Sequence, residues 1–263
     1  MDLNQVRLWL DRERRAGVVD EDDVELLPLI TRNHSADRSR HSVCFSALSV
    51  DNADENIAEQ VEFFCRQPGE VEWKAYAHDS PPDLLERLER YGFDLGPCEA
   101  VLVLDLNVTP KWVCQPLAHR VVRVENLDQV PLFRDVAERV FGGDWSTTAN
   151  GLSNAIRSGS TDHVGYIAFD EDVPAAIGRL YTRAKSMFGG LYGGGTLTAH
   201  RQRGLYRALV AARARDAKQF GARYLLVDAL PTSRPILESL GFAHLTDTWP
   251  CTLRKSDPTI SPG

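Results

Sequence analysis

Two stretches of the chain follow the same order of elements, and this likeness restricts the fold more than any other feature of the sequence. WKAYAHDSPPDLLERLERYGF begins at Trp73, and YLLVDALPTSRPILESLGF begins at Tyr224. Each joins an apolar strand pattern, a turn that contains proline, a short leucine-containing helix pattern and a closing Gly-Phe. Upstream of each lies a further strand, turn and helix pattern. The sequence therefore favours an internal duplication of one α/β unit over two unrelated strand–helix pairs that happen to end alike.

The composition is that of a globular protein with a sizeable core. The 263 residues are 43% hydrophobic and 25% charged, and the formal net charge is −7. A surface that is acidic overall does not attract nucleic acid or anionic lipid, so we expect neither a nucleic-acid partner nor a membrane partner. The charged N-terminal stretch MDLNQVRLWLDRERR does not fit a signal peptide. Five scattered cysteines show no metal or disulfide spacing, which predicts a cytoplasmic protein with reduced thiols and no metal site.

Strand and helix patterns alternate along the chain and predict an α/β fold with a mixed sheet. In the first half, the expected helices are an N-terminal one, 53–67 and 81–93, and the expected strands are 24–32, 42–48, 71–77 and 99–106. In the second half, the expected helices are 130–142, 204–220 and 233–242, and the expected strands are 120–126, 163–169, 175–184, 187–197 and 223–230. The polar stretch 142–161 is assigned no element, and the tail after Arg254 is expected to be disordered. Because residues 107–119 resemble a linker, we expect two domains, 1–110 and 119–255.

The stretch GGGTLTAHRQRGLYRAL, which begins at Gly193, predicts an anion site. The first amides of a helix have no partner within it, and the helix dipole adds partial positive charge there. Gly204 lets the backbone approach a ligand closely, and Arg201, Arg203 and Arg207 add charge suited to phosphate. The stretch matches neither G-x-x-x-x-G-K-S/T nor the dinucleotide pattern G-x-G-x-x-G after a strand. From these residues alone, a solvated basic loop is nearly as good an interpretation.

TLTAHRQRGLYRALVAARARD resembles motif A of the GNAT superfamily, the acetyl-CoA-dependent N-acetyltransferases. The family pattern Q/R-x-x-G-x-G/A is matched from Arg201 to Leu205, with Tyr206 in the last position. LLVDALPTSRPILESLGF resembles the strand and helix that follow this motif, including the closing L-G-F. The resemblance covers about 121–253. It implies a GNAT-like fold of two related halves, in which the C-terminal half is a full acetyl-CoA-binding domain.

The resemblance also implies where acetyl-CoA binds. The backbone of the strand before motif A would pair with the pantetheine arm, and the amides at the helix start would hold the pyrophosphate. The coenzyme-binding residues implied in this way are Thr196, Leu197, Thr198, Arg201, Gln202, Arg203, Gly204, Leu205, Tyr206 and Arg207. The glycines 193–195 would leave room for the thioester end of the coenzyme, and a bulged edge strand without a ligand is the other interpretation.

The N-terminal half has no such cradle. SVDNADENIAEQV stands where motif A would be expected, and Asp51, Asp54 and Glu55 favour a helix start but repel a pyrophosphate. This stretch also contains no glycine that would permit close approach of a ligand. We therefore expect the N-terminal half to be a degenerate copy that does not bind the coenzyme.

The activity implied by the resemblance is direct transfer of an acetyl group from acetyl-CoA to a primary amine of a small molecule or peptide. Many family members protonate the departing thiolate with a tyrosine on the late helix, but Leu237 occupies that place here and cannot donate a proton. An asparagine often found before that helix is also missing, because Leu230 and Pro231 stand there.

Proton transfer therefore needs other groups. The candidate catalytic residues are Asp228, Tyr192 and Ser233, with Tyr181 as a further possibility, and each of these residue types also serves in packing or capping. Direct attack on a well-positioned thioester needs little more than orientation, so Leu237 weakens the prediction of an enzyme without removing it. The alternative functions are a non-catalytic acyl-CoA-binding sensor or interaction module and, less favoured, a phosphate-binding regulator unrelated to CoA.

Overall fold

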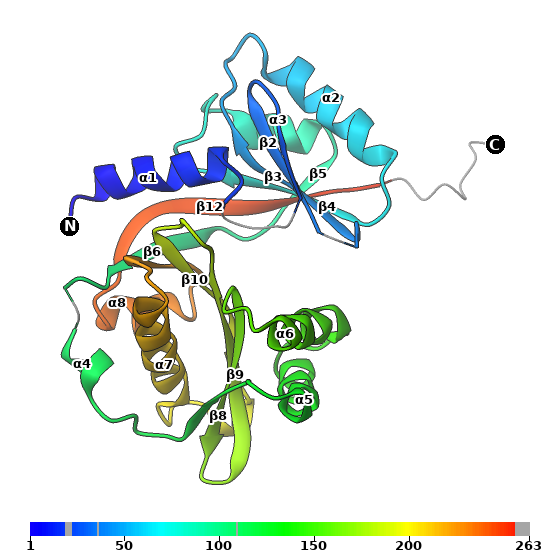
Figure 1. Ribbon diagram of the computed structural model, residues 1–263. Coiled ribbons are helices and arrows are strands. Elements are labelled where there is room, and N and C mark those ends of the chain that lie inside the picture. Colours follow the sequence, from blue (N-terminus) through cyan, green and yellow to red (C-terminus); the bar gives the residue numbers. More distant parts are fainter. Residues whose placement is uncertain (19–22, 36, 109, 256–263) are drawn as a thin grey trace. The chain divides into compact units, whose positions relative to one another are not determined.

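The computed structural model describes residues 1–18, 23–35, 37–108 and 110–255, and it divides into two compact units. The first unit contains Met1–Val101, Ala229–Thr232 and the chain from Leu245 onward. The second contains Leu102–Asp228 and Ser233–His244. Figure 1 shows their elements. Each unit takes part of its chain from the other half of the sequence. The division into two domains, 1–110 and 119–255, stays a prediction.

The first unit is a mixed sheet with helices. Its helices are α1 (Leu3–Arg15), α2 (Ala53–Cys65) and α3 (Leu84–Arg90), and its strands are β1 (Asp23–Leu26), β2 (Ile30–His34), β3 (Arg40–Ser46), β4 (Glu70–Tyr76), β5 (Phe93–Leu95) and most of β12 (Ala243–Leu253). The strand order is β1-β2-β3-β4-β12, and β5 also pairs with β12. Strands β3 and β4 are parallel, while β4 and β12 are antiparallel. Trp73, Phe64 and Phe93 are fully buried at the centre of its core.

The second unit repeats this arrangement with longer strands. Its helices are α4 (Lys111–Cys114), α5 (Val130–Phe141), α6 (Ser146–Ser158), α7 (Leu205–Gln219) and α8 (Arg234–Ser239), and its strands are the end of β6 (Glu99–Asp105), β7 (Val121–Arg123), β8 (His163–Asp170), β9 (Val173–Thr182), β10 (Phe188–Thr196) and β11 (Tyr224–Ala229). The strand order is β6-β11-β10-β9-β8-β7. Helix α7 packs on one face of this sheet, and α5 and α6 pack on the other (Figure 1).

The repeat predicted from the sequence is visible in the local topology of the two units. In each, two parallel strands are joined by a helix, β3-α2-β4 in the first unit and β10-α7-β11 in the second. The short helix that follows ends at a glycine with positive φ, Gly92 at 92° and Gly241 at 93°. Only glycine adopts this conformation readily. The phenylalanine after each glycine is buried, so the closing Gly-Phe has one structural role in both copies.

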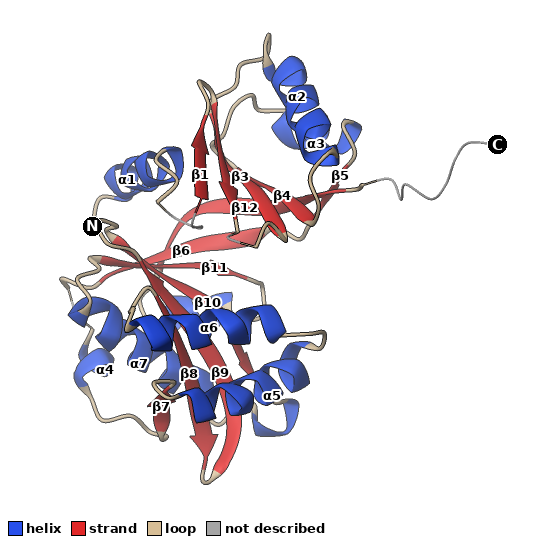
Figure 2. Cartoon of the chain, turned by 45° about the vertical axis from the view of Figure 1, so that its right-hand side comes forward, coloured by secondary structure: helices blue, strands red, loops and turns tan. Residues whose placement is uncertain are grey.

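Two expectations from the sequence were wrong in detail (Figure 2). Residues 24–32 form two strands rather than one, because the chain turns at Pro28, which lacks an amide hydrogen for a ladder. The polar stretch 142–161 contains α6. Its buried face consists of two alanines and one leucine, Ala149, Ala155 and Leu152. The tail expected to be disordered lies, after Lys255, outside the described residues.

The stretch predicted to be a linker is held against the second unit rather than running free. It contains α4, and the Trp112 indole donates a hydrogen bond to the Leu240 carbonyl at 2.9 Å. The Arg215 guanidinium, on α7, donates to the carbonyls of Val113 and Gln115. None of the helices in the described part of the chain has the length and apolar character needed to cross a bilayer.

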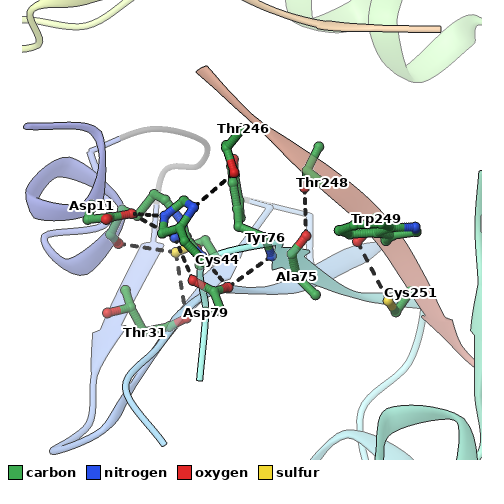
Figure 3. A network of polar contacts seen from close by, with 12 residues as sticks. Asp11, Thr31, Cys44, Ala75, Tyr76, Asp79, Thr246, Thr248, Trp249 and Cys251 are labelled. Carbon is green, nitrogen blue, oxygen red and sulfur yellow. Dashed lines mark hydrogen bonds and ion pairs between the residues drawn. The ribbon is translucent and has the colours of Figure 1, made fainter. Parts of the chain in front are cut away.

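A buried ion pair ties α1 to the sheet of the first unit. The Arg14 guanidinium donates two hydrogen bonds to Asp79, at 2.9 and 2.8 Å, and its Nε donates to the Cys44 carbonyl at 3.0 Å. Its plane lies over the Tyr76 ring, 3.8 Å from the ring centre. Figure 3 shows the surrounding network, in which His78 bridges Asp11 and the Thr246 hydroxyl of β12. Burial by itself lowers the pKa of Arg14, but the charge and hydrogen bonds of Asp79 outweigh it and raise that pKa.

We predict that Asp79→Asn destabilises the first unit by about 3 kcal/mol, because it removes the bidentate partner of the buried Arg14 charge and leaves it with Asp11, which is partly exposed. Urea unfolding followed by the fluorescence of the buried Trp73 measures the loss. Glu62→Gln is the control, because it removes an exposed ion pair with Arg66 whose contribution is at most about 0.5 kcal/mol. Equal midpoints for the two variants would contradict this role for the ion pair.

Candidate functional site

Helix α7 begins at a corner that only glycine suits. Its N-cap, Gly204, has φ of 91°, and Gln202 two residues earlier has φ of 63°. A Cβ added at Gly204 would have His119 as its nearest neighbour, at 3.6 Å from Nε2. The first amides of this 15-residue helix begin at this corner, where His119 is hydrogen-bonded to the Arg203 carbonyl at 2.6 Å. The start of a helix is an arrangement that can bind an anion.

The two parallel strands beside this corner separate from each other. Strands β10 and β11 pair from Phe188–Tyr224 to Gly190–Leu226, and no further ladder pair between them is found in the described part of the chain. Strand β10 nevertheless continues to Thr196 on the β9 side. The rest of β10 has therefore left its parallel partner, next to the start of α7.

A run of glycines shapes the separated part of β10. The pairing of β10 with β9 shifts register between Tyr192 and Gly195, and Gly193 has φ of 50°. A Cβ on Gly194 would lie 2.9 Å from the Tyr206 ring, and one on Gly195 would lie 2.5 Å from Val140 of α5. Since any side chain at these positions would collide with neighbours from one face or the other, the bulge requires glycine.

The basic side chains around the corner are held by local partners. Arg201 Nε donates to the Thr196 carbonyl at 3.2 Å, and Arg207 donates to the Ser239 hydroxyl at 2.8 Å. Arg203, although exposed, donates to Asp170 at 2.7 Å. These contacts fix the three side chains beside the start of α7.

Tyr206 stands where motif A has glycine or alanine, and the position of its ring explains how the larger side chain is accommodated. Its ring lies against Gly194 of β10, on the α7 face of the sheet, and its hydroxyl is hydrogen-bonded to Ser233 at the start of α8. Burial raises the pKa of Tyr206, against the opposing charge of Arg213 and the bond to Ser233. The ring therefore crosses from α7 to the glycine bulge and keeps its proton at neutral pH.

Solved structures resemble the whole chain. A GCN5-related N-acetyltransferase from Kribbella flavida superposes with a TM-score of 0.67 at 16% identity, covering 95% of each chain. A tandem GNAT protein from the clavulanic acid biosynthesis pathway has a TM-score of 0.57 at 12% identity and covers 98% of this chain and 97% of its own. A GCN5-related N-acetyltransferase from Sphaerobacter thermophilus has a TM-score of 0.53 at 12% identity, with 92% and 85% covered. The chain has the GNAT fold.

This likeness lies in the structure and not in the sequence. No sequence-family model matches the chain, and no curated protein matches it in sequence. Identities of 12 to 16% show the fold alone. The resemblance to GNAT proteins that motif A predicted is thereby confirmed for the fold, including its mixed α/β sheet, while the coenzyme-binding residues stay a prediction.

The candidate catalytic residues of this GNAT fold lie in different places. Ser233 precedes α8 and meets Tyr206, and Tyr192 lies at the bulge with its ring 5.1 Å from the Tyr181 ring, edge to face. Asp228 is half-buried near the end of β11. Leu237 is fully buried in the core, so it contributes packing and cannot donate a proton.

Sequence reasoning missed two arginines that lie beside the glycine bulge of β10. Arg179 in β9 and Arg213 in α7 lie on opposite faces of the glycine bulge. The signal that could have found them is the glycine at the facing positions, Gly178 opposite Arg213 and Gly193 opposite Arg179. A glycine within a strand often marks a place where another group approaches closely.

The corresponding corner of the first unit differs from the Gly204 corner. At the start of α2, Asp54 pairs with Arg87 at 2.7 Å, and Asp83 pairs with the same guanidinium. This helix start therefore carries carboxylates and an arginine that they already engage. No group of histidine, cysteine and acidic residues suited to a metal ion is found among the described residues.

The Asp170 carboxylate links the turn after β8 to the corner, because it accepts from His200 and from Arg203, both at 2.7 Å. The hydrogen bond from His200, helped by the charge of Arg203, lowers the pKa of Asp170. Since the folded pKa lies below the unfolded one, the stabilisation is fully present above about pH 4 and is lost as the pH falls through the folded value.

We predict that Asp170→Asn lowers the urea midpoint at pH 6 and that its midpoint approaches that of the wild type as the pH falls below about 4. Unfolding curves between pH 3 and 7 measure this. Asp172→Asn, an exposed change in the same turn, is the control. A constant difference between Asp170→Asn and wild type across that pH range would contradict the pairing.

Proposed function

We propose that this protein is an N-acetyltransferase that moves the acetyl group of acetyl-CoA directly to a primary amine of a small molecule or peptide. The observation that carries the proposal is the separation of β10 from β11 beside the open Gly204 corner. The extended pantetheine arm of acetyl-CoA fits between separated strands, and its diphosphate fits the free amides of a helix start. The GNAT fold of the chain supports the same conclusion.

The coenzyme would be held by the chain from β10 to the start of α7. In this proposal the diphosphate accepts from the amides of Gln202 to Arg207, and the pantetheine arm runs along the backbone of Thr196 to Thr198. Acetyl-CoA supplies an acetyl thioester, whose reacting end lies at the glycines 193–195. At the Gly204 corner an added Cβ would meet His119 at 3.6 Å, in ordinary contact, so the diphosphate end has room. At the bulge, the thioester end would lie next to Tyr206 and Arg179, which pack against Gly194 and Gly193.

Tyr206 is the proposed proton donor in place of the tyrosine that α8 lacks. The amine nitrogen attacks the thioester carbon, the carbon–sulfur bond breaks, and the sulfur takes the proton of the Tyr206 hydroxyl. The attacking nitrogen loses one proton to a base, for which Tyr192 and Asp228 are the candidates, and Tyr206 is then reprotonated through Ser233. The raised pKa of Tyr206, caused by burial, suits an acid that must be protonated at neutral pH.

We further propose that the segment 119–255 binds the coenzyme, that the segment 1–110 is a degenerate copy that does not, and that the protein works in the cytoplasm. Two carboxylates support the second point, since Asp54 in the first turn of α2 and Asp83, the N-cap of α3, share Arg87 and would repel a diphosphate. The scattered unpaired cysteines support the third.

We predict that Gly204→Val reduces affinity for acetyl-CoA at least about tenfold, because a branched side chain covers the helix amides and strains a residue with positive φ. Gly221→Val is the matched control: Gly221 follows the other end of α7, has φ of 93° and faces open space, whereas a Cβ at Gly204 would be in ordinary contact with His119. Both variants bear the same backbone strain, so isothermal titration separates a lost site from lost stability. Equal affinities for the two variants would contradict the placement of the coenzyme.

We predict that Tyr206→Phe lowers the rate of thiol release about a hundredfold while coenzyme affinity changes little, because it removes only the proton of a buried ring. Thiol release with a panel of amines and titration with acetyl-CoA measure the two quantities. An unchanged rate would exclude Tyr206 as the acid. Coenzyme binding without thiol release from any amine in the wild type would favour the non-catalytic sensor instead.

A further inference from the structure

Arg179 occupies the face of the sheet opposite α7, at the glycine bulge. It lies in β9 and pairs with Tyr192 of β10. Its Nε and Nη2 atoms are each 3.1 Å from the place where a Cβ of Gly193 would be. Because Gly193 has no side chain, the guanidinium lies directly over the backbone at which the thioester end of the coenzyme is proposed to bind.

The guanidinium of Arg179 has aromatic neighbours, and no carboxylate in the described part of the chain pairs with it. Its central carbon lies 5.4 Å from the centre of the Trp145 ring and 5.6 Å from that of Tyr181, and Nη1 donates to the Tyr181 hydroxyl at 3.2 Å. Its Nε is buried without an acceptor. Within the described ranges of the chain, no acidic side chain forms an ion pair with Arg179.

A second uncompensated arginine lies on the other side of the same bulge. Arg213 is only 1% exposed, and it donates to the carbonyls of Leu209 at 3.1 Å and of Arg179 at 3.2 Å. Its Nη2 is buried without an acceptor. Burial lowers the pKa of Arg213, Tyr206 and Tyr166 oppose this, and the charge of Arg179 adds to the lowering. Two like charges thus meet through the sheet, and in the described part of the chain neither forms an ion pair with a carboxylate.

The neighbouring charges of Arg179 and Arg213 destabilise the folded protein unless an anion binds beside them. A buried charge without a partner costs several kcal/mol, and two neighbouring cations repel each other in addition. Arg213 is enclosed by the sheet and α7, so an anion can reach the pair only through Arg179. That side chain is partly exposed and faces the side of the sheet where α5 and α6 lie.

The surroundings of Arg179 fit a small organic acid rather than a bare ion. Trp145 stacks on Phe141 with ring centres 5.1 Å apart, and Tyr181 stacks on His163 at 4.3 Å. The rings of Trp145 and Tyr181 offer flat apolar surfaces near the guanidinium. A guanidinium binds a carboxylate with two parallel hydrogen bonds.

We propose that Arg179 binds a carboxylate of the acceptor, so that the substrates of this site are small amines that also carry a carboxylate, as amino acids do. The inference rests on the proposed function: the coenzyme reaches the bulge from the α7 side, and the amine must then approach from the opposite face, where Arg179 lies. The carboxylate on Arg179 holds the amine over Gly193, and Trp145 and Tyr181 contact the rest of the molecule.

The test compares acceptors that differ only in the carboxylate. Thiol release from acetyl-CoA is measured with L-phenylalanine, L-phenylalaninamide and phenethylamine, and with L-leucine, L-leucinamide and isoamylamine. We expect kcat/KM to be at least about tenfold higher for each acid than for its amide or its decarboxylated amine. Equal use of the acid and the amide in both series would overturn the proposal.

Substitutions of Arg179 test the residue itself. Arg179→Gln should remove the preference by lowering kcat/KM for the acids and not for phenethylamine, and Arg179→Lys, which keeps the charge without the planar fork, should restore part of it. Arg157→Gln, an exposed arginine on α6, is the control and should leave the preference intact. Titration with CoA should give wild-type affinity in every variant and so shows that each is folded. A preference that survives in Arg179→Gln would overturn the assignment.

Failure of the proposed function gives a different result from failure of this inference. If no amine causes thiol release, L-phenylalanine and L-phenylalaninamide are titrated into the CoA-loaded protein. Binding of the acid alone, lost in Arg179→Gln, would support the carboxylate site in a non-catalytic protein. Binding of neither, or of both equally, would overturn it.

Discussion

The site depends on one constraint on β10: this strand has to stay in the sheet with β9 while it leaves β11. A regular strand cannot do this without losing backbone hydrogen bonds on one side, and the structure meets the requirement with a bulge of glycines after only three residue pairs with β11. The glycines are needed because side chains from both faces crowd the bulge, Tyr206 from the α7 side and Val140 from the α5 side. The space next to the start of α7, in which we place the coenzyme, exists because β10 bends away at this point.

The same bulge brings unusual charges together. Gly178, Gly193 and Gly194 let two guanidinium groups approach the sheet from opposite faces, where residues with a Cβ would exclude them. Elsewhere in the protein a buried arginine is compensated, as Arg14 is by Asp79. The absence of a carboxylate partner for Arg179 and Arg213 in the described residues is therefore a local property of the bulge. A binding site that must attract an anion explains it better than a packing requirement does, because packing alone would be met by an apolar side chain.

The two units show how one arrangement of strands and helices carries different sites. The order β3-α2-β4-α3 in the first unit matches β10-α7-β11-α8 in the second, down to the positive-φ glycine before a buried phenylalanine. The difference lies at the helix start. Helix α7 follows Gly204 and is surrounded by arginines, whereas α2 begins with Asp54 and Glu55 and has Arg87 engaged by Asp54. The fold is shared, and the side chains at one corner decide whether an anion can bind there.

What could be predicted from the sequence depends on neighbours along the chain: the start of α7 at Gly204, the repeated Gly-Phe ends, and the alternation of strands and helices. The likeness to the GNAT fold came from the motif around Gly204 and from the closing L-G-F. The sequence did not predict α6, because this helix has too few apolar residues to show a helical pattern. It also did not predict the turn at Pro28, which lies within an apolar run. The tertiary structure alone decided that the Tyr206 ring turns towards Gly194 and Ser233, and that Arg179 and Arg213 meet at one bulge. Those contacts join residues up to 34 positions apart through strand register and helix packing, and register is set by the whole sheet and not by any local pattern.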